Sequence, residues 1–167
     1  EVRRRFLLPL WNVYSFLVTY ANIDGWQPGE HTAPISSMLD RWILSRLNQL
    51  IQTVTACLDE YDAYGATLAV ETFLDDLTNW YVRRSRRRFW KSEQDADKYA
   101  AYTTLYNVLT TLCRLLAPFV PFVTEVMYQN LVRTVDPAAP ESVHHTLWPA
   151  ADPSAIDEQI LKRMALA

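Results

Sequence analysis

The densest group of chemically distinctive side chains is the segment 79–91, Asn-Trp-Tyr-Val-Arg-Arg-Ser-Arg-Arg-Arg-Phe-Trp-Lys. It holds six of the chain's 16 basic residues and none of its 19 acidic ones, although the formal net charge is −3. Guanidinium groups bind phosphate oxygens in pairs, and aromatic rings stack on unpaired bases. A basic and aromatic segment in an otherwise acidic chain therefore favours binding to RNA.

Helical spacing decides which of these arginines share a face. At about 100° per residue, an apolar stripe continues into three arginines: Phe73, Leu77 and Trp80, then Arg84, Arg87 and Arg88. Arg83 falls on the flank of this stripe, and Arg86 points elsewhere. We therefore expect Arg84, Arg87 and Arg88 to form the main phosphate-contacting edge, where the helix leaves the core.

The predicted RNA-binding set adds aromatic and carboxamide side chains to these arginines. It consists of Arg83, Arg84, Arg87, Arg88, Trp80, Asn79, Phe89, Trp90, Asn12 and Ser15. Asn79 and Asn12 are candidates for reading base edges, because a carboxamide both donates and accepts hydrogen bonds.

A structural role for the same residues is equally compatible with the spacing. Arginines in a last helical turn complement the helix dipole and pair with local acids, here Asp75, Asp76, Glu93 or Asp95. The four aromatic residues of the segment are individually more typical of packing than of base stacking.

Catalytic and metal-binding patterns are not evident in the sequence. Cys57 and Cys113 stand alone in helical patterns, and His144 and His145 have no acid or cysteine at a metal-ligand spacing. No strand followed by a glycine-rich loop offers a phosphate cradle for ATP. We therefore expect no catalytic residue, no metal and no cofactor in this chain.

The uncharged stretch 6–23 follows three arginines and resembles a signal peptide or a short membrane span. Polar residues recur on one face of it at helical spacing: Asn12, Ser15, Thr19 and Asn22. Such a two-faced helix fits burial against protein or RNA better than contact with lipid. We expect a soluble chain whose polar stripe is either a second RNA face or, slightly favoured, a seam with another domain of the same chain.

Apolar spacings of three and four place these residues on helices. We expect helices over about 3–20, 37–61, 66–90, 102–116, 121–131 and 154–167, with loops at 22–34 and 92–95 and a surface-wrapping segment at 135–153. Ser37 and Asp40 have the spacing of an acidic capping box. The predicted fold is all-α, an antiparallel bundle of four to five helices with short connections.

Five segments, in the same order, carry a family resemblance. Residues 79–90 resemble a signature of the anticodon-binding domain of isoleucyl-tRNA synthetases, which are class Ia enzymes, in the subgroup of eukaryotic cytosolic and some bacterial enzymes. Segments 8–16, 40–47 and 117–125 are similar as well, and 141–149 resembles the family's closing segment. The family's two ATP-handling signatures, His-Ile-Gly-His and Lys-Met-Ser-Lys-Ser, are not in this sequence.

The resemblance implies a domain that clamps the anticodon stem and loop of the isoleucine tRNA. Its partners would be that tRNA and the catalytic domain of the same chain, which would use ATP and Mg²⁺ in the cytoplasm. It implies a helical domain over 1–149 and the start of a truncated C-terminal extension over 150–167. The alternatives are the corresponding domain of a valyl or leucyl enzyme, a helical module whose basic end binds an acidic protein, or a membrane-surface helix over 3–20.

Overall fold

The regular elements of the chain are helical, as expected. The computed structural model describes residues 3–31 and 33–166, and the part described contains no strand. The α-helices are α1 (Leu8–Asp24), α2 (Met38–Asp59), α3 (Ala63–Asp75), α4 (Arg83–Trp90), α5 (Ala96–Leu116), α6 (Pro121–Tyr128) and α7 (Glu158–Ala165). The π-helical turns are η1 (Arg3–Leu7), η2 (Asp76–Val82) and η3 (Gln129–Arg133), and the 3₁₀ turns are η4 (Val143–His145) and η5 (Pro153–Ala155).

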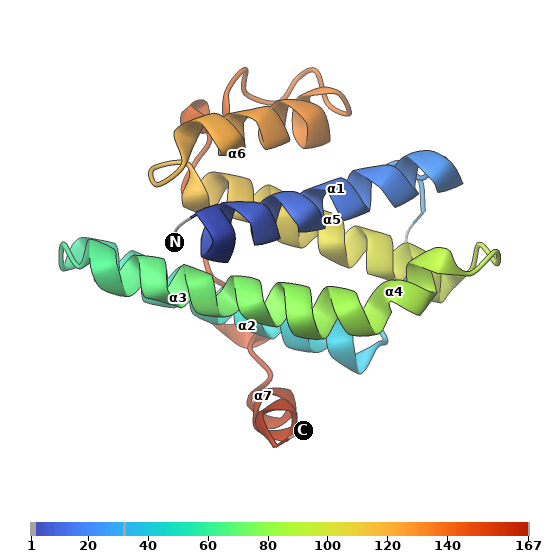
Figure 1. Ribbon diagram of the computed structural model, residues 1–167, viewed down its shortest axis with the longest axis horizontal. Helices are drawn as coiled ribbons and strands as arrows, with labels where there is room; N and C mark the ends of the chain where they lie inside the picture. Colours follow the sequence, from blue (N-terminus) through green and yellow to red (C-terminus); the bar gives the residue numbers. More distant parts are fainter. Residues whose placement is uncertain (1–2, 32, 167) are drawn as a thin grey trace.

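Four long rods form the bundle: α1, α2, the continuous run α3–η2–α4, and α5. Consecutive rods run in opposite directions, so α1 and the α3–η2–α4 run point the same way and lie side by side on one face (Figure 1). α6 packs on α5 on one side of the bundle, and α7 packs on α2 on the other. The predicted all-α antiparallel bundle is confirmed.

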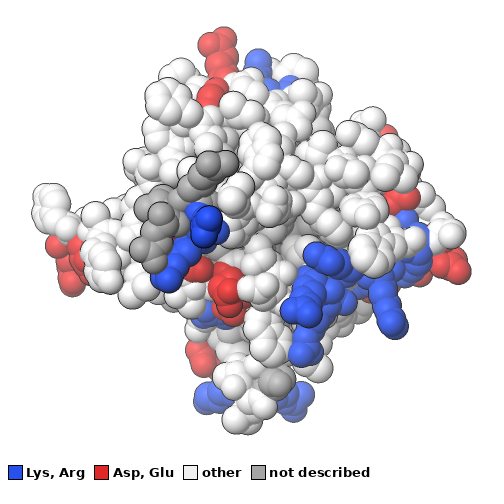
Figure 2. Space-filling view, viewed as in Figure 1, with Lys and Arg blue, Asp and Glu red and all other residues white. Residues whose placement is uncertain are grey.

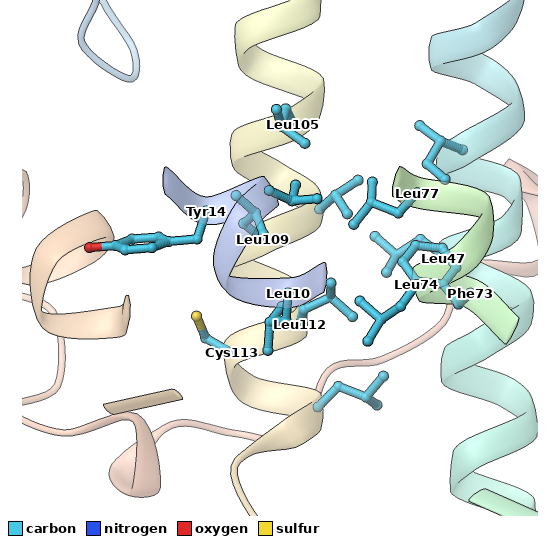
Figure 3. Packing of buried hydrophobic residues seen from close by; sticks show 14 of the residues in the cluster. Leu10, Tyr14, Leu47, Phe73, Leu74, Leu77, Leu105, Leu109, Leu112 and Cys113 are labelled. Atoms are coloured by element: carbon cyan, nitrogen blue, oxygen red, sulfur yellow. The ribbon is translucent and has the colours of Figure 1, made fainter. Parts of the chain in front are cut away.

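The core lies where the four rods meet. Leu10 of α1, Leu74 of α3, Leu77 of η2 and Leu109 of α5 are fully buried and point towards one another (Figure 3). Cys113 of α5 is also fully buried, and burial raises the pKa of its thiol to about 12. Cys113 is therefore a residue of the core.

The apolar N-terminal segment forms a wall of this core. Among the described residues one helix, Arg4–Asp24, is long and apolar enough to cross a membrane. Core helices of folded proteins meet the same criterion, and this one buries Leu10, Val13 and Leu17 in the bundle. It continues four residues past the expected end at residue 20 and stops at Gly25, whose φ of 68° is the left-handed conformation that glycine adopts most readily.

The π-helical turns of η2 shift the register of the α3–η2–α4 run. A π turn contains more residues than an α turn, so every later side chain is rotated relative to a regular helix. One line of buried positions recurs in steps of four rather than at the α-helical average of 3.6, with Leu74 and Val82 buried beside it: Phe73, Leu77, Tyr81, Ser85 and Phe89. Beyond Leu77, the inward stripe lies one residue later than the regular helix predicts, which changes the arginines that face solvent.

Two local predictions are wrong. Ser37 precedes α2 in an extended conformation but makes no side-chain capping bond, and Asp40 is fully buried rather than part of a capping box. Helical spacing also predicts that Phe122, Val126 and Leu131 face inward in the segment 121–131, but only Leu131, in η3, is buried, whereas Phe122 is 87 % exposed. α6 lies at one edge of the bundle, and the side of this short helix that carries Phe122 and Val126 is exposed.

The C-terminal residues pack against the second rod. Ile160 of α7 is buried, and Arg41 of α2 donates a hydrogen bond of 2.6 Å to Asp157, the residue that caps α7. The boundary expected at residue 149 stays a prediction.

Candidate nucleic-acid interface

A groove of about 620 Å³ runs between α1 and the α3–η2–α4 run. It is lined by Arg4, Arg5, Pro9, Asn12, Val13, Phe16, Glu71, Asp75, Thr78, Asn79, Val82, Arg83 and Arg86. On this side of the molecule, basic side chains gather over α4 and beside the N-terminal end of α1, with acidic side chains between them (Figure 2). The groove therefore has cationic ends and a polar centre.

Three of the predicted RNA-binding residues meet in this groove. Asn12 comes from α1, whereas Asn79 and Arg83 come from η2 and α4, and all three side chains are exposed. The structure thus places together both carboxamides proposed to read bases, although they lie 67 positions apart in the sequence.

Arg86 also lines the groove, contrary to the expectation that it points elsewhere. It lies three residues after Arg83, and the shifted register turns both side chains towards α1. Regular α-helical turns through η2 would point Arg86 away from this face, and the π-helical turns of η2 change that. Arg4 and Arg5, two of the three arginines that precede the uncharged stretch 6–23, occupy the other end of the groove.

Arg88 does not form part of the exposed edge. Its guanidinium holds the fully buried Asp40 with two hydrogen bonds of 2.7 Å and also donates to the backbone oxygen of Asp97 at 2.9 Å. Tyr81 donates to the same Asp40 carboxylate at 2.8 Å. Arg88 therefore ties α4 to the start of α2 and the start of α5, and the prediction that it is an exposed phosphate contact is wrong.

The electrostatics of this cluster favour the ion pair. Burial disfavours the charged guanidinium, but the hydrogen bonds and the charge of Asp40 outweigh that effect and raise the pKa of Arg88. Burial, and then the negative charge of Asp40, raise the pKa of the Tyr81 hydroxyl well above its ordinary value. Asp40 therefore faces one permanent cation and one neutral donor, as a buried carboxylate requires.

The aromatic residues of the segment divide between core and surface. Phe89 is 1 % exposed and packs edge-on against Phe16 and Tyr102, so base stacking by Phe89 is excluded. Trp90, at the end of α4, is 55 % exposed. Trp80 is half-buried and lies outside the groove, with the guanidinium of Arg84 4.4 Å from its ring centre. The side chain of Arg84 therefore has an aromatic partner already.

The remaining predicted residues, Arg87 and Ser15, do not line the groove. Arg87 is exposed, and Ser15 is half-buried. The polar stripe on α1 reaches the groove only through Asn12; Asn22 borders a separate hollow of about 330 Å³ beside α5 and η3.

A second buried ion pair supports the turn after α4. Lys98 is 1 % exposed, pairs with Asp24 at the end of α1 at 2.6 Å, and donates to the backbone oxygen of Lys91 at 2.8 Å. Tyr102 donates to the same Asp24 carboxylate. These contacts fix the ends of α1 and α4 against α5, so the two walls of the groove are held in a defined relation.

The chain matches known proteins over nearly its whole length. Residues 40–167 match the model of a family described as the anticodon-binding domain of tRNA ligase. A protein of Dehalococcoides mccartyi named isoleucine–tRNA ligase is 61 % identical over 161 residues, or 96 % of this chain. Proteins of the same name from Clostridium novyi and Thermus thermophilus are 51 % and 49 % identical, covering 100 % and 98 % of the chain.

The chain spans 16 % of the length of each of these relatives. The resemblance that residues 79–90 carry therefore agrees with a family match over most of the chain, and the helical bundle agrees with both. This chain belongs to the anticodon-binding domain family of tRNA ligases.

Proposed function

We propose that the chain binds the anticodon stem and loop of the isoleucine tRNA, as one domain of a cytoplasmic enzyme that joins isoleucine to that tRNA. The catalytic domain of the same chain is then its second partner. The relatives named isoleucine–tRNA ligase, each about six times longer than this chain, support this assignment.

The observation that carries the proposal is the groove between α1 and α4. Arg83 and Arg86 are exposed cations at one end of it, and Asn12 and Asn79 lie along its walls. Guanidinium contacts to phosphate supply affinity without sequence preference, whereas carboxamides can hydrogen-bond to base edges. An RNA strand along the groove would meet both kinds of group.

In this proposal, the ATP-dependent chemistry of the enzyme belongs to its catalytic domain and not to this chain. Among the described residues, no group of three or more His, Cys, Asp or Glu side chains could hold a metal ion. The sequence also carries neither of the family's two ATP-handling signatures, so the proposed role of this chain is to hold and orient tRNA while the catalytic domain binds ATP and Mg²⁺.

Salt-dependent binding of an isoleucine tRNA transcript tests the proposal. Arg83→Ala with Arg86→Ala should weaken binding and reduce the slope of log affinity against log salt by roughly two units, because two phosphate contacts are lost. The control is Lys162→Ala with Arg163→Ala, which removes two exposed charges from α7 and should leave the slope near its original value.

The alternatives give different results in the same experiment. If tRNA transcripts for valine or leucine compete for the chain as well as the isoleucine tRNA does, the isoleucine assignment is contradicted. Binding of tRNA that is insensitive to salt, or no binding by the pure chain, would contradict the RNA interface and favour a module that binds an acidic protein.

A further inference from the structure

The centre of the groove is rich in hydrogen-bond acceptors. Asp75 ends α3 and Asn79 follows one turn later in η2, and the Asn79 carboxamide donates to Asp75 Oδ1 at 2.6 Å. Both side chains are exposed and line the groove. A carboxylate is unexpected in an RNA groove, because it repels the phosphate backbone.

The Asp75–Asn79 hydrogen bond fixes which atoms this pair presents. One Asn79 N–H group is engaged by Asp75, which orients the carboxamide and leaves its Oδ1 as an acceptor. An ionised carboxylate can only accept, so Asp75 adds further acceptor positions and no donor. The pair therefore presents more acceptors than donors to anything that enters the groove.

The cations flank this pair on both sides. Arg83 and Arg86 follow Asp75 by eight and eleven residues, or about 12–16 Å along a helix, and Arg4 and Arg5 lie at the opposite end beside α3. Phosphates are thus attracted to the two ends, and the backbone of a bound strand is kept away from the centre. The group that reaches Asp75 is then a base edge.

We propose that the Asp75–Asn79 pair selects an unpaired base that carries an exocyclic amino group. This inference rests on the proposed RNA-binding function and assigns a specificity role to Asp75. A carboxylate accepts a hydrogen bond from the amino group of cytosine, whereas uracil presents the acceptor O4 at that position and offers only its N3–H as a donor. Asn79 alone can pair with either base, so Asp75 makes the distinction.

Short RNA strands that differ by one group test this selectivity. Binding of the 167-residue chain is measured with cytidine and uridine hexamers, and with adenosine and purine-riboside hexamers, of which only the first of each pair carries the amino group. The amino-bearing hexamer should bind about tenfold more tightly in each pair. The salt slopes within a pair should agree, since the phosphates are the same.

Asp75→Asn removes the charge with little change in shape. It should weaken cytidine binding, strengthen uridine binding and bring their ratio to within about twofold, because no carboxylate is left to favour the amino group. Asp59→Asn, an equal charge change at an exposed site outside the groove, should keep the tenfold ratio. Glu71→Gln, at the basic N-terminal end of the groove, should strengthen the binding of both hexamers equally and keep the ratio of their affinities.

The failures of the two proposals are distinguishable. Salt-sensitive binding with equal affinity for both members of each pair, or an unchanged ratio in Asp75→Asn, overturns the selectivity and leaves RNA binding intact. An unchanged ratio with a lower melting temperature would assign Asp75 a purely helix-stabilising role. If no hexamer binds in a salt-sensitive manner, the groove is not an RNA site, and the proposed function fails as well.

Discussion

The two sides of α4 use the same residue type in opposite ways. On one side, Arg83 and Arg86 are exposed in the groove. On the other, Arg88 is held by the buried Asp40 and by Asp97. A dense run of arginines is therefore not a single site: the position of the nearest carboxylate decides whether an arginine anchors the fold or stays exposed to phosphate.

The two roles depend on one another. The anchor ties α4 to α2 and α5, and the groove arginines lie on the same helix beside α1. Mutations on the inward side should therefore change the stability of the fold, whereas mutations on the groove side should change the affinity for RNA.

The largest expected effect is on the inward side. Arg88→Ala should lower the free energy of unfolding by about 3–5 kcal/mol, because it leaves the carboxylate of Asp40 buried without its cation. Urea denaturation measures the loss. A change below about 0.5 kcal/mol, the size of a surface effect, would place Arg88 with the exposed arginines and remove the contrast.

The stability loss in Arg88→Ala can be compared with the loss at an apolar core position. Leu109→Ala on α5 should cost about 2–5 kcal/mol, since this side chain is fully buried between α1 and the α3–η2 walls. It is measured by the same denaturation, and RNA binding by the folded fraction should keep its salt slope. A smaller slope of log affinity against log salt in this variant would mean that the slope reports folding rather than phosphate contacts.

The contrast within α4 explains what the sequence could and could not predict. Periodicity predicts the rods, and the motif at 79–90 predicts the family. Regular helical spacing predicts the wrong inward face for α4 because the register shift in η2 depends on packing, although the spacing of four through Phe73, Leu77 and Tyr81 is a visible sign of it. The pairing of Asp40 with Arg88 joins residues 48 positions apart, and no local pattern marks it.

A carboxylate outside the groove, that of Glu125, should make the stability of the fold depend on pH. Glu125 of α6 accepts hydrogen bonds from Gln129, Ser142 and the backbone of Val143, at 2.8–2.9 Å. Burial opposes its charge, but these donors outweigh that effect and lower the pKa of Glu125. Its contribution to stability is therefore complete above the ordinary pKa of glutamate and is lost as the pH falls through the lowered value.

Glu125→Gln should accordingly cost about 1–2 kcal/mol at neutral pH, because the charge-assisted acceptor is lost. Thermal melts across the acid range measure the difference from the unmodified chain, which should shrink as the carboxylate protonates. A difference that stays constant with pH would show that the charge of Glu125 contributes nothing to holding residues 142–143.

The smallest effect on stability is expected from mutations of two neighbouring arginines, which should differ in their effect on RNA binding. Arg86 lines the groove and Arg87 does not, although both are exposed and adjacent on α4. Each change to alanine should alter the free energy of unfolding by less than about 0.5 kcal/mol, because neither side chain is buried. Arg86→Ala should lower the salt slope of tRNA binding by roughly one unit, whereas Arg87→Ala should leave it nearly unchanged. A regular helix through η2 predicts the reverse order. If Arg87 carries the larger loss, the phosphate edge lies on the face that the α-helical spacing indicates, and the groove beside α1 is not where the RNA backbone runs.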